Sequence, residues 1–194
     1  MPERRTTYFC VDIEASGPVP GLYDMISLGA VVVAPDQETG KLTKGATFYQ
    51  EIIPEAPRFD ERTVPIHGLT KAHLHANGLP RRTAAVQLAD WVNANLRPGT
   101  TPTFVGHNAP FDWSFVAWVY AAEDLPNPFG YKALCTKSLS AGALHLHWLD
   151  SNKETLSERL MLTAEDHSQK HRADYDAMYQ ADILIGLLAH IGQH

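Results

Sequence analysis

The stretch YFCVDIE at residues 8–14, followed by Ala15-Ser16-Gly17, decides the fold of this 194-residue chain. Its apolar, aromatic and β-branched residues, ended by a Ser-Gly break, predict a β-strand. Because side chains alternate along a strand, Asp12 and Glu14 share one face, and the apolar residues around them take the opposite face. Two neighbouring carboxylates repel each other and need a positive partner, for which a divalent metal ion is a candidate. The alternative at this point is a solvated strand end with two incidental acids.

The chain is long enough for one domain with a sizeable core, and its 44% hydrophobic and 20% charged residues are typical of a globular protein. The formal net charge of -6 argues against a protein that coats long nucleic acids by electrostatic attraction alone. It is compatible with an enzyme that grips a short nucleic-acid end with the help of metal ions. No apolar signal region and no apolar run of membrane-spanning length is present, so we expect a cytoplasmic protein with no membrane partner.

Five segments have the composition and bounding turns of strands: residues 8–14, 26–33, 47–53, 103–106 and 131–136. The first three follow one another closely, as in an antiparallel meander. Helical patterns begin after Thr83 and Asn108, recur in short stretches at 137–145 and 154–162, and end the chain. The connection over 54–82 is too irregular for a single element. This order predicts an α/β fold with a mixed five-stranded sheet and helices on both faces.

Two further acids stand in structured settings. Asp112 lies one turn into the helix after the fourth strand, and Asp176 opens the last helix. His171 precedes Asp176 by five residues, and on a continuous helix the two side chains would point about 140° apart. They can meet only if His171 lies in the loop before the helix, which the polar stretch 165–170 permits. Taken singly, each acid has a plain alternative as a first-turn residue favoured by the helix dipole, and His171 as a surface histidine.

Three motifs together resemble those of the DEDDh exonuclease family: Asp12-x-Glu14 with Ser16-Gly17, Asn108-Ala109-Pro110-Phe111-Asp112, and His171-x-Ala173-x-x-Asp176-Ala177. That family includes ribonuclease T, oligoribonuclease and the proofreading subunit of bacterial replicative polymerase. The resemblance covers residues 8–188 and implies a ribonuclease H-like fold, with one exonuclease domain over residues 1–194. It also implies a 3′-to-5′ exonuclease that releases nucleoside 5′-monophosphates from the ends of RNA or single-stranded DNA.

The resemblance assigns two divalent ions, Mg²⁺ or Mn²⁺, to four metal-binding acids: Asp12, Glu14, Asp112 and Asp176. Hard carboxylate oxygens suit both metals, and two such ions activate water and stabilise the leaving oxygen in phosphodiester hydrolysis. His171 takes the position of the general base, since a histidine can accept a proton near neutral pH. In isolation each pattern is weak, and the agreement of all three at a strand end, a helix start and a loop–helix junction carries the prediction.

The expected substrate contacts rest on the same resemblance. The segment Ile66-His67-Gly68-Leu69-Thr70 resembles a stretch that packs near the 3′-terminal nucleotide, which makes His67 and Leu69 candidates; a loop histidine and a buried anchor are the alternatives. Ala15 and Ser16 offer backbone groups to that nucleotide. Asn108 is a candidate for a hydrogen bond near the site, and also for the cap of the helix that follows.

The expected partner is a single strand or a 3′ overhang, because no long basic surface is evident. The resemblance is also compatible with a homodimer and with association with a polymerase. No residue declares a contact to a 2′-hydroxyl, so the sequence does not distinguish RNA from DNA. A non-catalytic binding module would need a broken acid set, and none is broken. An endonuclease on the same fold would leave the spacing of His171 and Asp176 unexplained.

Overall fold

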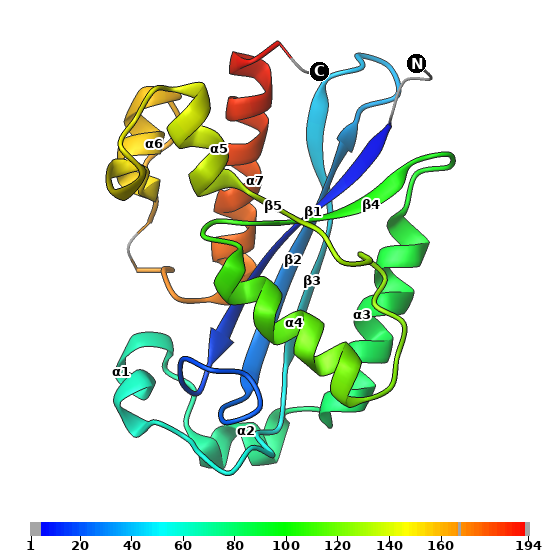
Figure 1. Cartoon of the computed structure of the whole chain (residues 1–194), viewed down its shortest axis with the longest axis vertical. Coiled ribbons are helices and arrows are strands. Elements are labelled where there is room, and N and C mark those ends of the chain that lie inside the picture. The colour runs from blue at the N-terminus through cyan, green and yellow to red at the C-terminus, as the bar shows by residue number, and fades with distance from the viewer. Residues whose placement is uncertain (1–4, 167, 193–194) are drawn as a thin grey trace.

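A computed structural model of the chain describes residues 5–166 and 168–192 (Figure 1). One mixed sheet with the order β3-β2-β1-β4-β5 runs through its centre. The first three strands pair antiparallel, and β1, β4 and β5 run parallel to one another. Both the meander and the mixed five-stranded sheet are thereby confirmed. The strands are β1 (Thr6–Ala15), β2 (Met25–Pro35), β3 (Leu42–Glu51), β4 (Thr101–Gly106) and β5 (Ala133–Cys135).

Helices cover both faces of the sheet, as predicted. Figure 1 shows α3 and α4 on one side and α7 on the other, with α5 and α6 packed beside α7. Short helices α1 and α2 lie beyond the end of β1. The α-helices are α1 (Val64–His67), α2 (Lys71–Asn77), α3 (Arg81–Asn95), α4 (Pro110–Ala122), α5 (Thr136–Ala143), α6 (Lys153–Arg159) and α7 (Ala173–His190), and two 3-10 turns are η1 (Glu61–Thr63) and η2 (Trp148–Asp150).

The alternation along β1 divides the core as the sequence predicts. Phe9, Val11 and Ile13 are buried in the large cluster under α3 and α4. Cys10 points to the opposite face, where it packs with residues of α7. Asp12 and Glu14 therefore lie on the α7 face, at the end of the strand.

Several expected boundaries are wrong by a few residues. The third strand begins at Leu42 and ends at Glu51, and the fifth is confined to Ala133–Cys135 because Thr136 already begins α5. Asn108 does not cap α4. Its backbone is left-handed (φ 63°), whereas a capping residue needs an extended backbone, and Ala109 takes the cap position with no side-chain hydrogen bond.

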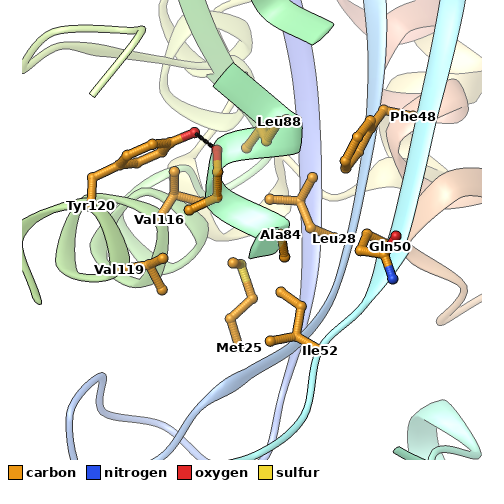
Figure 2. Close-up of a pocket in the computed structure, with 11 residues that line it drawn as sticks. Met25, Leu28, Phe48, Gln50, Ile52, Ala84, Leu88, Val116, Val119 and Tyr120 are labelled. Carbon is orange, nitrogen blue, oxygen red and sulfur yellow. Dashed lines mark hydrogen bonds between the residues drawn. The ribbon is translucent and has the colours of Figure 1, made fainter. Parts of the chain in front are cut away.

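A void of about 10 Å³ lies between the sheet and the helices α3 and α4 (Figure 2). Its walls are apolar side chains, including Leu28 and Val116, and Tyr120 closes one side by donating its hydroxyl to the carbonyl oxygen of Ala85 at 2.9 Å. This is space for about one water molecule, so it is a packing defect and not a ligand site. No helix within the described ranges is long and apolar enough to cross a membrane.

Candidate active site

The four predicted metal-binding acids come together at one edge of the sheet. Asp12 and Glu14 end β1, and Asp112 and Asp176 lie in the first turns of α4 and α7. Because β1 and β4 are parallel, their carboxyl ends meet at the same edge, and α4 starts there directly after β4. All four side chains line one open cavity of about 370 Å³.

Internal hydrogen bonds fix these acids. Oδ1 of Asp112 accepts the backbone N–H of Ile13 at 3.1 Å, which ties the start of α4 to the end of β1. The buried Gln180 donates its Nε2 to Oδ1 of Asp12 at 2.5 Å, and its Oε1 accepts the backbone N–H of His107 at 3.2 Å. Gln180, on α7, therefore connects Asp12 of β1 to His107, which follows β4, and holds the Asp12 carboxylate in place.

His171 lies in the loop before α7, as its spacing from Asp176 predicts. Its backbone is left-handed (φ 65°), and its N–H donates to Oδ2 of Asp176 at 2.8 Å. One ring nitrogen of His171 and one oxygen each of Glu14 and Asp176 lie within 4.8 Å of one another. The exposed imidazole therefore faces the acids across the cavity.

The carboxylates are crowded and shielded from water. Burial, with the charges of Asp176 and Asp112, raises the pKa of Glu14 to about 8. Burial raises the pKa of Asp112 to about 7, although the hydrogen bond from Ile13 opposes this. The pKa of Asp12 is raised well above its usual range by burial and by Asp112. The metal-free cavity thus disfavours the full negative charge of its own ligands.

Lys153, from the first turn of α6, supplies part of the missing positive charge. Its ammonium contacts Oδ1 of Asp176 and lies 3.5 Å from Oε1 of the buried Glu165. Burial opposes the charged form, but the carboxylates of Asp12 and Asp176 outweigh it and raise the pKa of Lys153. Sequence reasoning missed this residue, because only the docking of α6 against α7 brings it to the acids.

The residues fit divalent metal ions. Four carboxylates converge on one cavity, two of them with pKa values raised to about 7 and 8, and a lysine ammonium already stands against one of them. Such a cluster of hard oxygen ligands with excess negative charge suits Mg²⁺ or Mn²⁺.

The expected substrate residues divide into two groups. Asn108 lines the cavity with its left-handed backbone. Ala15 and Ser16 do not line it, and Ser16 is fully engaged: its N–H donates to the carbonyl of Asp24 at 2.9 Å and its carbonyl accepts from Asp60 at 2.8 Å. The Ser16 backbone is therefore used by the loop itself.

His67 and Leu69 belong to the segment around α1. His67 accepts the Leu69 N–H at 3.0 Å on Nδ1, and its Nε2 lies 3.0 Å from Oγ1 of Thr63. Burial lowers the pKa of His67, and the charge of His171 contributes to that shift, so the two histidines are electrostatic neighbours. Neither His67 nor Leu69 lines the cavity in this structure.

Comparison with known proteins shows the family. The sequence model of the 3'-5' exoribonuclease Rv2179c-like domain matches residues 7–187. The chain belongs to this family. A 3'-5' DNA exonuclease, Cap18 of Escherichia coli, is 35% identical over 178 residues, which are 91% of this chain and 88% of that protein. Ribonuclease T of Marinobacter nauticus is 26% identical over 92% of this chain and 80% of its own length.

Solved structures confirm the fold. The nuclease domain of 3'hExo, described as a DEDDh family member and bound to rAMP, superposes with a TM-score of 0.77 at 15% identity, covering 95% of this chain and 92% of that domain. Exonuclease I of E. coli in complex with a dT13 oligonucleotide gives a TM-score of 0.72 at 16% identity, over 97% of this chain and 42% of that protein. The family model and the relatives confirm the predicted 3′-5′ exonuclease, and the solved structures, one of them described as a DEDDh family member, confirm the fold that the resemblance implies.

Two further residues of the Rv2179c-like site, Gln180 and His107, could have been recognised from their positions in the sequence. Gln180 follows Asp176 by one helical turn, so a polar residue in the apolar stripe of the last helix marks the same face. His107 precedes the second motif and lines the cavity, with Nδ1 3.0 Å from Oγ1 of the buried Thr136. Burial, with Lys153 and Lys137, lowers the pKa of His107 to about 4, so it stays neutral and supports the site.

Proposed function

We propose that this Rv2179c-like protein is a metal-dependent exonuclease that hydrolyses the terminal phosphodiester bond at the 3′ end of a single strand and releases a nucleoside 5′-monophosphate. The observation that carries the proposal is the convergence of Asp12, Glu14, Asp112, Asp176 and His171 on one cavity. A cavity of about 370 Å³ is in the range of small-molecule sites, which suits one terminal nucleotide.

The four carboxylates would hold two divalent ions, Mg²⁺ or Mn²⁺, which when bound supply positive charge beside the phosphate and make water more acidic. Besides burial, the charges of the other three acids raise the pKa of Asp12, so all of them lie near it. Gln180 and Ile13 hold the carboxylates of Asp12 and Asp112 in place. The preorganisation of these ligands is the chain's main contribution, because the protein need not reorganise as charge develops.

His171 would act as general base. A ring nitrogen of His171 lies within 4.8 Å of oxygens of Glu14 and Asp176, and the ring is exposed on the open side of the cavity. The ring takes the proton of the attacking water, and the proton leaves to solvent from the open side of the cavity. The backbone N–H of His171 donates to Asp176, which holds the main chain that carries the ring beside the acids.

The proposal covers both RNA and DNA, because the comparisons include nucleases described for each. The family is described as exoribonucleases, and the Cap18 relative is a DNA exonuclease. Both reactions need the same acids and the same base, so the proposal holds at the level of the phosphodiester bond.

The test uses 5′-labelled RNA and DNA single strands of one sequence, incubated with the protein and Mn²⁺ or Mg²⁺. We expect a metal-dependent ladder that shortens from the 3′ end, with mononucleotide products, and the faster strand shows the preferred sugar. EDTA and Asp12→Ala abolish it, while Asp90→Asn, at an exposed position of α3, leaves it unchanged. Internal fragments, or binding without cleavage of either strand, would refute the proposal.

A further inference from the structure

Three lysines line the cavity, and their partners differ. Lys153 pairs with Asp176 and Glu165, and Lys170 pairs with Glu165 and with Glu154 at 3.0 Å. Lys137, in the first turn of α5, has no carboxylate partner within the described ranges. The ammonium of Lys137 therefore adds a positive charge to the cavity wall without forming an ion pair with the acids.

The partner of Lys137 is an aromatic ring. Its Nζ lies 4.3 Å from the ring centroid of Trp148, the first residue of η2. Trp148 is 44% exposed, and the neighbouring Leu149 is 66% exposed. In Figure 1 the α5–α6 lobe that carries these residues lies beside α7, whose first turn holds Asp176. Lys137 lines the cavity, and its contact with Trp148 connects the cavity wall to η2.

A lysine beside an exposed tryptophan matches the chemistry of one nucleotide. A nucleotide offers an anionic phosphate for the ammonium and a planar base for the ring, and single-strand binding proteins combine the same two groups. The match tolerates any base, because each base has a π-face. Lys137 lines the cavity with the acids and contacts Trp148, so the subsite is continuous with the reaction site.

We propose that Lys137 and Trp148 form a subsite for a nucleotide of the strand further to the 5′ side than the two nucleotides that the scissile bond joins, with Lys137 on a phosphate and Trp148 on a base. The proposal rests on the exonuclease function proposed above and adds the path of the single strand. The subsite binds substrate and does not take part in bond cleavage. Only strands long enough to reach it from the acids gain from it.

The test compares kcat and KM for a dinucleotide and for a single strand of roughly ten nucleotides. For the long strand we expect Trp148→Ala to raise KM about tenfold with kcat nearly unchanged. Lys137→Met raises KM similarly and lowers the slope of log affinity against log salt by about 0.7, because one phosphate contact is lost. Neither variant changes KM for the dinucleotide. Trp148→Phe, which keeps a stacking ring, restores most of the affinity.

A second lysine–aromatic pair provides the matched control. Lys132 lies 5.1 Å from the ring centroid of Tyr131, which is 81% exposed, but both precede β5, whereas the cavity lies beyond its other end. Lys132→Met should leave KM and the salt slope unchanged. Unchanged KM in the Lys137 and Trp148 variants, with an active wild type, would refute the subsite alone. An equal effect on the dinucleotide would also refute it, and an inactive wild type would refute the exonuclease function as well.

Discussion

The backbone N–H of His171 donates to Oδ2 of Asp176 at 2.8 Å, across the junction between the last loop and α7. The other oxygen of Asp176 contacts the ammonium of Lys153. One carboxylate thus positions the proposed base with one atom and holds a cation with the other. The position of the base and the affinity for positive charge are coupled through this residue.

Two substitutions of Asp176 separate these roles. Asp176→Asn keeps an oxygen that can accept the His171 N–H, whereas Asp176→Ala removes it and leaves that N–H without its partner. We expect both variants to lose metal affinity and activity by at least about tenfold, because a charged ligand is gone. The alanine variant should be less stable than the asparagine variant by about 1 kcal/mol.

Isothermal titration with Mn²⁺ and thermal unfolding without metal measure the two effects. Equal unfolding temperatures for the Asn and Ala variants would show that the hydrogen bond does not hold the loop. Wild-type metal affinity in either variant would remove Asp176 from the metal site.

Replacement of His171 by glycine tests the general base. Glycine accepts the left-handed backbone (φ 65°) without strain, so the substitution removes the imidazole and leaves the loop intact. We expect kcat to fall by about 10²–10⁴, with partial recovery when imidazole is added to the buffer. His145→Gly is the matched control, because His145 is exposed, has a left-handed backbone (φ 53°) and lies outside the cavity. A fall in kcat that imidazole does not reverse would favour a role other than proton transfer.

Lys153 should compete with the metal for Asp176. Its removal in Lys153→Met frees Oδ1 of that carboxylate, so we expect Mn²⁺ to bind on the order of tenfold more tightly. Lys170→Met is the control: Lys170 lines the same cavity but pairs with Glu154 and Glu165 instead of a predicted metal ligand. A similar gain in both variants would indicate a general change of charge in place of direct competition, and a loss in Lys153→Met would contradict the prediction.

The sequence predicts the acids of this site better than their surroundings, for a physical reason. Strand alternation places Asp12 and Glu14 on one face whatever packs there, and the helical period requires His171 to lie outside α7. Lys153 becomes a site residue only when α6 docks on α7, and no local pattern encodes that contact. Asn108 has the residue type of a cap, yet its left-handed backbone excludes that role.

Metal-free stability should fall as pH rises through the neutral range. The folded-state pKa of Glu14, about 8, lies above its ordinary value of 4.5, so between these values the folded state holds a proton that the unfolded state has lost. Asp112, with a folded-state pKa of about 7, acts in the same direction. Each group changes the unfolding free energy by at most about 1.4 kcal/mol per pH unit.

Metal binding should reverse this trend, because the ions bind the deprotonated carboxylates. We expect Mn²⁺ to raise the unfolding temperature more at alkaline than at mildly acidic pH, and Glu14→Gln to flatten the metal-free pH dependence. Thermal unfolding across pH, with EDTA or with Mn²⁺, makes the comparison. Without metal, a free energy of unfolding that rises from mildly acidic to neutral pH would contradict the raised pKa values of Glu14 and Asp112.

Gly29 permits the start of α7 to reach the sheet. It lies opposite Asp12 in the register of β1 and β2, and a Cβ added there would stand 2.2 Å from the backbone carbon and oxygen of Ala173. Gly29→Ala must therefore push the first turn of α7, which carries Asp176, away from Asp12. We expect a loss of about 1–3 kcal/mol of stability and reduced metal affinity.

Gly45→Ala, in β3, is the control. A Cβ added at Gly45 meets its nearest atom only at 3.7 Å, so the substitution should not lower the free energy of unfolding, because alanine is otherwise preferred over glycine in a strand. If the two alanine variants unfold alike and bind Mn²⁺ alike, close packing at Gly29 does not set the geometry of the site.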